Sequence, residues 1–505
     1  MCPPGVRPGG VQPSHSGHVP FGGCPQGVMS RSRIVRAICG VILCASLVGC
    51  GGGSSQLGGQ TQNNGNSSVV LAMTDTPPTE VTILSAEITL TGATLAPGNV
   101  SLFSGSTTVE LARLQTDVAY LATAANIPAG NYTSVTLTFA NPSLTFENDT
   151  AATLAGCAVG AICKIVPTST SMSATVPLQS FSLTSSSTTG LLVDVDTETL
   201  LSATLSADFS AGTTVTSFTP AGIGAPPVGA EDVVGQVGNV SASSSTFTLT
   251  NATGSYALKA NSSSTFFQFP SGTNCATPVF SCLQNNQIVS VDIAIDSSGS
   301  IVARNIVFED ADSSDAEVEG EITSTNAASQ QFSIVIHTVS ATGTGLTIGQ
   351  TETVQYSNSP QTPFDIDFLH IDNQQESTVS FASSFTGPAD LVPGQEVSIR
   401  RNSASGSTLI ADRVRLRSSR VTATVQSVGA PNITLTDLPS LFSGHGGVTQ
   451  IQAQTSITPP TIYFEIGVSV SASTDITHDI VAVRGPLFNS GGTNRTLLTT
   501  KVFVK

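Results

Sequence analysis

Apolar and polar residues alternate in short runs along most of the chain beyond residue 68. Val135, Leu137 and Phe139 alternate with Ser and Thr, and Val193 and Val195 alternate with acidic residues. Alternation with a period of two predicts strands that bury one face. Turn-forming residues separate the runs, as in the Ile-Pro-Ala-Gly sequence at 127–130. The pattern therefore predicts an all-β protein.

One segment of the amino-terminal half has helical rather than strand periodicity. Leu111, Leu114, Val118 and Leu121 recur at intervals of three and four residues. This spacing places apolar side chains on one face of a helix. We expect a helix over residues 111–125, with irregular coil as the alternative.

The alternating runs group into one large domain and three smaller, mutually similar ones. The first domain spans 68–218 and is followed by a Pro/Gly/Ala-rich linker at 219–231. Repeat 1 (232–310), repeat 2 (316–418) and repeat 3 (420–505) open with the similar runs VVGQV, VEGEI and VTATV. Internal similarity of this kind predicts tandem copies of one small fold. We expect an amino-terminal β-sandwich followed by three small β-barrels or β-sandwiches.

The amino terminus has the features of an export signal. Three arginines at 31–36 precede an apolar run at 37–47, which is too short to span a membrane. The sequence Leu47-Val48-Gly49-Cys50 then resembles the lipobox of bacterial lipoproteins, which implies that Cys50 is lipidated. We expect a leader over 1–49, with Met29 as the true start, and a flexible tether over 50–67. An ordinary signal peptide with an incidental cysteine is the alternative.

Charge restricts the function classes. Only 10% of residues are charged, which excludes a helical bundle because its exposed faces need Glu, Lys and Arg. Removal of residues 1–49 takes away four arginines and no acid, so that 14 basic and 34 acidic residues leave a formal charge of −20. Duplex binding requires a net basic footprint, and we therefore expect no nucleic-acid partner.

Four cysteines remain beyond the lipobox, in the two close pairs Cys157/Cys163 and Cys275/Cys282. Four cysteines allow three connectivities, and pairing within each short loop is favoured in an oxidising envelope. The alternative, a zinc site, is disfavoured by spacings of six and seven residues without a nearby histidine.

Motifs of known catalytic sites are missing from the sequence. It contains no HExxH, GxSxG, P-loop or GxGxxG sequence. The run Ser443-Gly444-His445-Gly446-Gly447 is similar to a glycine-rich oxyanion loop, but without a nucleophile elbow we expect a flexible surface loop. We therefore expect no enzymatic activity and no cofactor.

Acidic residues cluster in two places. Asp194, Asp196 and Glu198 share one face of a predicted strand, and seven acids fall between residues 309 and 321. A calcium site at Asp310, Asp312 and Asp315 is one interpretation of the second cluster. The spacing of a calcium loop is absent, so a solvated linker is the favoured interpretation.

Repeat 2 carries a complementary pattern of charge. Glu317, Glu319 and Glu321 share one face of its first strand, while arginines 413, 415 and 417 share one face of its last. Opposite charges on adjacent strands attract, so we expect these two strands to pair or lie close and to close a small barrel or sheet. The same arginines, together with those at 400, 401 and 420, form a basic concentration that an anionic glycan or phosphate could also occupy.

Two family resemblances accompany these patterns. The segments TDTPP, VTILSAEITLTG, PAGNYTSVTL and LLVDVDTETL over residues 68–210 resemble the bacterial lipoprotein domain of unknown function 4382, and the PAGNY turn is similar to prealbumin-like sandwiches. The three repeats resemble domain of unknown function 5666, the third loosely because it lacks the L-x-x-G-Q-x-V step. These resemblances imply an envelope location and β-sandwich structure, and they carry no known active site.

The sequence thus predicts a lipid-anchored protein of the bacterial outer membrane or cell surface. We expect a non-catalytic structural or interaction module with a membrane partner and an envelope protein or glycan partner. The alternative is a carbohydrate- or cell-wall-binding lipoprotein. Absence of Trp and dispersal of the five Tyr along the sequence weaken this alternative.

Overall fold

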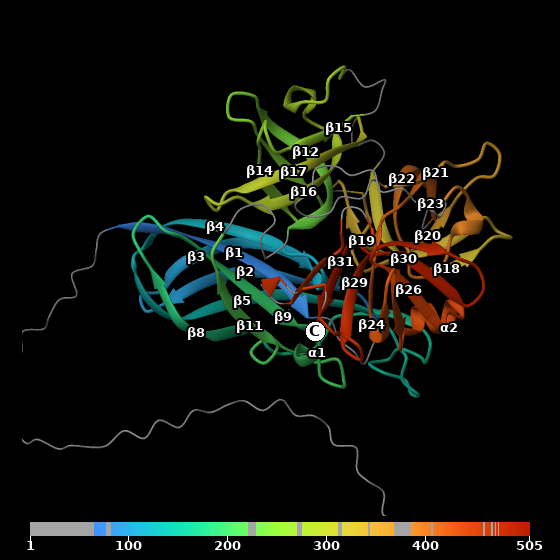
Figure 1. Cartoon of the computed structure of the whole chain (residues 1–505), viewed down its shortest axis with the longest axis horizontal. Helices are drawn as coiled ribbons and strands as arrows, with labels where there is room; N and C mark the ends of the chain where they lie inside the picture. The colour runs from blue at the N-terminus through green and yellow to red at the C-terminus, as the bar shows by residue number, and fades with distance from the viewer. Residues whose placement is uncertain are drawn as a thin grey trace, which may run out of the picture. The chain divides into compact units, whose positions relative to one another are not determined.

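The computed structural model of the chain describes residues 65–76, 82–220, 229–269, 275–311, 316–341, 344–367, 385–405, 408–457, 460–465, 468–469, 471–472 and 474–505. The predicted leader, Cys50, Met29 and most of the tether and the first linker lie outside these residues. The described chain is all-β, as predicted (Figure 1). In this part of the chain no helix has the length and apolar character needed to cross a membrane.

The amino-terminal domain is a sandwich of two main sheets. Its elements are β1 (Asn66–Thr76), β2 (Thr82–Ala96), β3 (Val100–Glu110), η1 (Leu111–Gln115), β4 (Ala119–Pro128), β5 (Gly130–Glu147), β6 (Ile162–Ile165), β7 (Ser169–Ser171), β8 (Ser173–Leu183), β9 (Thr188–Asp196), α1 (Thr197–Leu200), β10 (Ala207–Asp208) and β11 (Thr213–Phe218). One sheet has the order β11-β9-β1-β4, and the other has β3-β2-β5-β6 with β8 also on β5. Strands β7 and β10 form a small separate pair.

Strand β1 is buried on both faces, which explains its unbroken apolar sequence. Leu71 and Met73 lie in the sandwich core with residues of both sheets. Val70 and Ala72 point to the opposite face and belong to a core shared with repeat 1. The first strand therefore joins two domains through its two faces.

The predicted helix over residues 111–125 is wrong beyond its first turn. A short 3-10 helix covers Leu111–Gln115, and β4 begins at Ala119 and pairs antiparallel with β1. Leu111 and Leu114 are buried in the sandwich core, so the helical spacing is satisfied by one turn. The Tyr-, Thr- and Ile-containing sequence that follows suits an extended strand. Tertiary pairing with β1 thus overrides the local periodicity.

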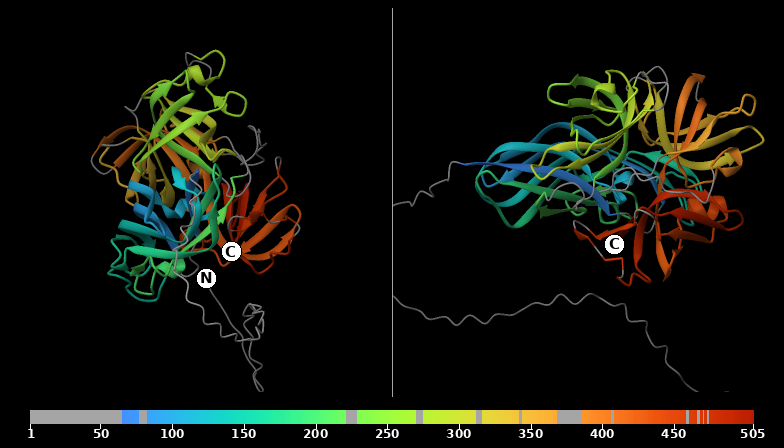
Figure 2. Two further views of the ribbon diagram at one scale, coloured as in Figure 1. Left: turned by 90° about the vertical axis from the view of Figure 1, so that its left-hand side faces the viewer. Right: turned by 45° about the horizontal axis from the view of Figure 1, so that its top comes forward.

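The three repeats contain the remaining elements (Figure 2). Repeat 1 has β12 (Ala230–Ser241), β13 (Thr246–Thr250), β14 (Ser255–Ala260), β15 (Phe266–Gln268), η2 (Phe280–Cys282), β16 (Ile288–Ile295) and β17 (Ile301–Asp310). Repeat 2 has β18 (Glu317–Asn326), β19 (Gln331–Val339), β20 (Thr351–Gln355), β21 (Phe364–Ile366), η3 (Pro388–Asp390), β22 (Glu396–Ser405) and β23 (Thr408–Leu416). Repeat 3 has β24 (Ser418–Gly429), β25 (Asn432–Thr436), α2 (Ser440–Gly446), β26 (Gln450–Gln454), β27 (Ile462–Glu465), β28 (Val468–Ser469), β29 (Ile480–Asn489), β30 (Asn494–Leu498) and β31 (Lys501–Val504).

All three repeats share one closed strand order. In repeat 1 the order β14-β13-β12-β16-β17 closes through a parallel pairing of β14 with β17. Repeat 2 closes in the same way through β20 and β23, and repeat 3 through β26 and β30. When only the five ring strands of each repeat are numbered in chain order, so that short strands such as β15 and β21 are skipped, the order around the ring is 1-2-3-5-4-1. This is the order of the five-stranded Greek-key barrel known as the OB fold.

In repeat 3 the last barrel strand is divided in two. Strand β30 pairs with β26, and after a two-residue break β31 pairs in parallel with β27. In repeats 1 and 2 a single strand makes both of the equivalent pairings. Repeat 3 therefore differs from the other two in its last barrel strand.

The domains are packed against one another rather than strung on linkers. Residues Thr61 to Lys505 form one compact unit. Leu84 of the sandwich lies in the core cluster of repeat 3, and Phe488 of repeat 3 lies in that of repeat 2. The contacts at these junctions include most of the charged residues discussed next.

Candidate functional site

Three of the acidic residues near the junction of repeats 1 and 2 are buried and two, Asp310 and Glu321, are half-buried, so their interpretation as a solvated linker is wrong for those that the structure describes. Glu309 is 2% exposed, Glu317 0% and Glu319 1%. A buried carboxylate needs a cation or several hydrogen-bond donors to offset its lost hydration. The required cations come from repeat 2 and, for Glu319, also from Arg113 of the sandwich.

Glu309, near the end of repeat 1, accepts hydrogen bonds from three arginines at the end of β23, the last of which directly follows the strand. Its carboxylate oxygens lie 2.7 Å from Arg413 Nη2, 2.8 Å from Arg415 Nη1 and 2.9 Å from Arg417 Nη2. Burial by itself raises the pKa of Glu309, but the three guanidinium charges outweigh it and lower the pKa to about 2. We call these four residues the Glu309 cluster. It attaches the last strand of repeat 1 to the last strand of repeat 2.

The expected attraction between the acidic and basic strands of repeat 2 is confirmed. Arg413 Nη2 lies 3.1 Å from Glu317 Oε1, and Arg417 Nε lies 3.2 Å from Glu319 Oε1. The two strands are not neighbours, because β22 lies between β18 and β23. The long arginine side chains span that strand, and the barrel closes through β20 and β23 instead.

A second cluster joins the amino-terminal domain to repeat 3. Asp117, just after η1, lies 2.6 Å from Arg420 Nη2, 2.8 Å from Lys501 Nζ and 3.8 Å from Arg484 Nε. Burial raises the pKa of Asp117, and the three cations reverse this and hold it well below its usual range. We call these four residues the Asp117 cluster. One carboxylate of the sandwich thus contacts three cations of repeat 3, and Glu231 of β12 pairs with two of these, Arg484 and Lys501.

Arg113 connects the two clusters. Its Nη1 donates to Glu319 of repeat 2 at 2.6 Å, and its Nη2 donates to the backbone carbonyl of Asp232 in repeat 1 at 3.1 Å. The Asp232 carboxylate in turn accepts from Arg484 of repeat 3 at 2.6 Å. All four domains are therefore linked through buried charged groups.

His337 lies beside this network in a cavity of about 60 Å³, which has room for a few water molecules. Its Nδ1 is 2.9 Å from Glu396 Oε2, and its Nε2 is 2.5 Å from the carbonyl oxygen of Leu84 in the sandwich. Burial lowers the pKa of His337, but Glu396 more than compensates and raises it to about 9. The imidazolium therefore donates from both nitrogens. Burial raises the pKa of Glu321, which lines the same cavity, to about 8.

A much larger hollow lies between the sandwich and repeat 1. This groove has a volume of about 780 Å³, within the range of small-molecule sites. Strand β4 forms one wall, from Tyr120 to Thr123, and strands β13 and β14 form the other. The turn between β16 and β17, at residues 298–300, closes one end.

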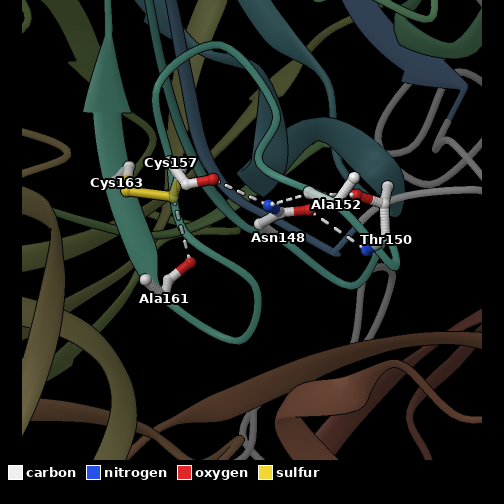
Figure 3. Close-up of a disulfide and its surroundings, with 6 residues drawn as sticks. All are labelled: Asn148, Thr150, Ala152, Cys157, Ala161 and Cys163. Atoms are coloured by element: carbon white, nitrogen blue, oxygen red, sulfur yellow. Dashed lines mark hydrogen bonds between the residues drawn. A yellow bond between two sulfur atoms is a disulfide. The ribbon is translucent and has the colours of Figure 1, made fainter.

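Both cysteine pairs form disulfides within their loops, as the sequence predicts. The loop closed by Cys157–Cys163 is organised by the fully buried Asn148 (Figure 3). Asn148 Nδ2 donates to the carbonyl oxygens of Cys157 at 2.8 Å and Ala152 at 2.9 Å. Asn148 Oδ1 accepts from the Thr150 hydroxyl at 2.7 Å. These contacts give the bridge a structural role.

The described acidic residues considered for metal binding each contact a different partner and do not gather around one point. Asp310 lies 3.5 Å from Arg400, and Asp312 and Asp315 lie outside the described residues. Asp194 accepts from the Thr76 hydroxyl, whereas Asp196 caps the four-residue helix α1. Within the described ranges no group of three or more His, Cys, Asp or Glu side chains is arranged to hold a metal ion. Calcium at 310–315 stays a prediction.

The glycine-rich segment around His445 is a short helix, not the flexible loop that the sequence suggests. Helix α2 covers Ser440–Gly446, and both His445 Nε2 and Ser440 Oγ contact Glu147 Oε1, at 2.7 Å and 3.1 Å. The carboxylate separates the serine from the histidine, so the two do not form a nucleophile–base pair. The segment instead fastens repeat 3 to the sandwich.

Comparison with known proteins identifies only the amino-terminal domain. Residues 66–219 match the model of a family described as a domain of unknown function (DUF4382). This range agrees with the resemblance seen in the sequence over 68–210. No curated protein and no solved structure matches the chain. The match covers the sandwich and carries no assigned chemistry.

Proposed function

We propose that this chain is a lipid-anchored protein of the bacterial outer membrane or cell surface, and that it acts as a rigid, non-catalytic structural or interaction module. The observation that carries the proposal is the burial of charged side chains where repeat 1 meets repeat 2 and where the sandwich meets repeat 3. A chain that only needed linked domains would gain nothing from burying Glu309 and Asp117 beneath three cations each. Such clusters favour one arrangement of the domains, because separating the domains would leave buried charges without their partners.

The lipid anchor is supported by the leader, by the lipobox-like sequence at Cys50 and by the two disulfides, which persist in oxidising compartments. The repeats' resemblance to domain of unknown function 5666 is consistent with their shared barrel order. An envelope protein or a glycan is the expected partner, besides the membrane itself. Nucleic acid is not, because of the strongly acidic composition.

Metabolic labelling with palmitate tests the anchor. In a bacterial host, the full-length chain should incorporate label and remain with the membrane fraction. Cys50→Ala should lose both, whereas Cys44→Ala, which changes a cysteine of the apolar run, should retain both. Equal labelling of the two variants would refute lipidation at Cys50.

Limited proteolysis tests the rigid arrangement. The four domains of the wild-type protein should resist cleavage together, and Asp117→Asn should release repeat 3 first. A wild-type protein cut rapidly between its domains would contradict the proposal, as would turnover in an esterase or glycosidase screen. The alternative function, carbohydrate or cell-wall binding, requires a ligand site, and the groove beside β4 is the place to seek one.

A further inference from the structure

The groove between the sandwich and repeat 1 has walls that are held in place without a ligand. Thr123 Oγ1 donates to the carbonyl oxygen of Gly299 at 3.1 Å, and Thr188 Oγ1 donates to that of Ser298 at 3.3 Å. Near the opposite wall, the backbone N–H of Thr108 donates to the carbonyl of Thr253 at 3.2 Å. A preformed site loses little conformational freedom on binding, which favours affinity.

The wall provided by repeat 1 is the face that OB-type barrels use for recognition. It consists of the second and third strands, β13 and β14, together with the turn between the fourth and fifth strands at 298–300. Asn239, next to the turn between the first and second strands, also lines the groove. In OB folds this face and these two loops bind oligonucleotides or oligosaccharides. The groove therefore coincides with the binding face of the barrel.

The chemistry of the lining decides between those two ligands. Among the described residues that line the groove none is acidic, Lys259 is the one cation, and eight carry a Ser or Thr hydroxyl. Two of the chain's five tyrosines, Tyr120 and Tyr256, line it together although they are far apart in sequence. Tyr256 is half-buried, whereas Tyr120 is buried.

We propose that this groove binds an oligosaccharide. Hydroxyl groups on both walls and the Asn239 amide on one of them can exchange hydrogen bonds with sugar hydroxyls, and the Tyr256 ring offers an apolar face with a polar tip. A single lysine cannot neutralise a run of phosphates, which argues against single-stranded nucleic acid. Lys259 is instead placed to pair with an isolated carboxylate of an acidic sugar. The inference deepens the second proposed function and does not depend on the lipid anchor.

A glycan array probed with the full-length protein in detergent tests the proposal. The array carries neutral and uronic-acid-containing oligosaccharides of defined length. Wild type should bind at least one class, and titration calorimetry with that oligosaccharide should give its affinity. Ala257→Trp places an indole in the groove from an exposed position on β14 and should weaken binding more than tenfold. Ala125→Trp, an exposed alanine of β4 that does not line the groove, should bind like wild type.

A second variant avoids dependence on one bulky substitution. Thr248→Ala/Lys259→Ala removes a hydroxyl and an ammonium group from the groove without filling it, and should weaken binding about tenfold. Loss should be larger for an acidic than for a neutral sugar, since Lys259 contributes only to the former. Thermal melting of each variant shows that it is folded.

Three results would overturn the proposal. They are the absence of binding to every glycan, glycan binding that neither variant weakens, and variant-sensitive binding of an extended peptide or single-stranded DNA in place of sugar. None of these results bears on the palmitate experiment, so failure of the site is distinguishable from failure of the anchor.

Discussion

Asp117 and Lys501 are separated by 384 positions in the sequence, and their side chains meet at 2.8 Å in a place where both residues are buried. Lys501 begins the last strand of repeat 3, and Asp117 follows the first short helix of the sandwich. The chain must therefore complete its final strand before Asp117 acquires its full set of partners. This coupling makes the sandwich and the last strand of repeat 3 depend on each other for stability.

Removal of the Asp117 charge should destabilise the whole protein. In Asp117→Asn the three cations of repeat 3 stay buried with less compensation, and loss of one member of a buried ion pair costs about 3–5 kcal/mol. Urea unfolding at pH 7 should show this decrease. The control Asp437→Asn changes an exposed residue with positive φ, a conformation that Asn tolerates, and should stay within about 0.5 kcal/mol of wild type. Equal stability of Asp117→Asn and wild type would show that the cluster contributes nothing.

Glu309 should give the protein an acid-sensitive stability. The pKa of Glu309 is lowered from 4.5 to about 2 in the folded state, so its contribution is complete above pH 4.5 and is lost as pH falls through 2. The contribution is about 3 kcal/mol at 1.36 kcal/mol per pKa unit. In Glu309→Gln the stability deficit relative to wild type should be greatest near pH 7 and should shrink between pH 4.5 and 2. Glu465→Gln, at an exposed position, should follow the wild-type curve. A difference in stability between Glu309→Gln and wild type that does not change with pH would contradict the lowered pKa of Glu309.

The alternation of residues was sufficient to predict much of this architecture. A period of two placed Glu317 and Glu319 on one face and Arg413 and Arg417 on another, and their attraction followed from charge alone. The same pattern could not reveal that β22 lies between the two strands, because strand order depends on the closing pairing of β20 with β23. It also could not reveal burial at the junctions, since a charged residue on a strand face has the same sequence signature whether water or another domain covers it.

Contacts between segments that are far apart in the chain could not be predicted from the local sequence pattern. Asp117 lies inside the run with helical spacing, and nothing in the sequence relates it to Arg420. Tyr120 and Tyr256 looked dispersed because one belongs to the sandwich and the other to repeat 1, and only the packing of β4 near β14 brings them to one groove. The cysteine pairs, in contrast, were predictable because each bridge closes a short loop.

Loss of the Cys157–Cys163 bridge should cost about 2 kcal/mol. The bridge closes a short loop between residues six positions apart, and the entropy that this removes from the unfolded chain corresponds to about 2 kcal/mol at 25 °C. The Cys157→Ala/Cys163→Ala variant should therefore unfold at lower urea concentration than wild type under oxidising conditions, and dithiothreitol should narrow the difference. Free-thiol labelling of the denatured, unreduced wild type should detect none of the four cysteines. Labelling of any of them would contradict the pairing.

His337 should give the protein a stability that falls on the alkaline side. Its pKa is raised from 6.5 to about 9 by folding, so its contribution is complete below pH 6.5 and is lost as pH rises through 9. Glu321 acts in the same direction. Burial raises its pKa from 4.5 to about 8, so between these pH values the folded protein keeps a proton that the unfolded chain has lost. The free energy of unfolding therefore falls as the pH rises from 4.5 to 8.

His337→Gln separates these two contributions. The glutamine cannot carry the charge that faces Glu396, so the variant should be less stable than wild type at pH 6 and should approach it by pH 10. Its stability should still decline from pH 4.5 to 8, because Glu321 remains buried. His478→Gln alters an exposed histidine and should leave the wild-type slope unchanged. Urea midpoints at half-unit pH intervals measure all three curves. A His337→Gln curve parallel to wild type from pH 6.5 to 9 would mean that the folded protein does not hold an imidazolium between Glu396 and the Leu84 carbonyl.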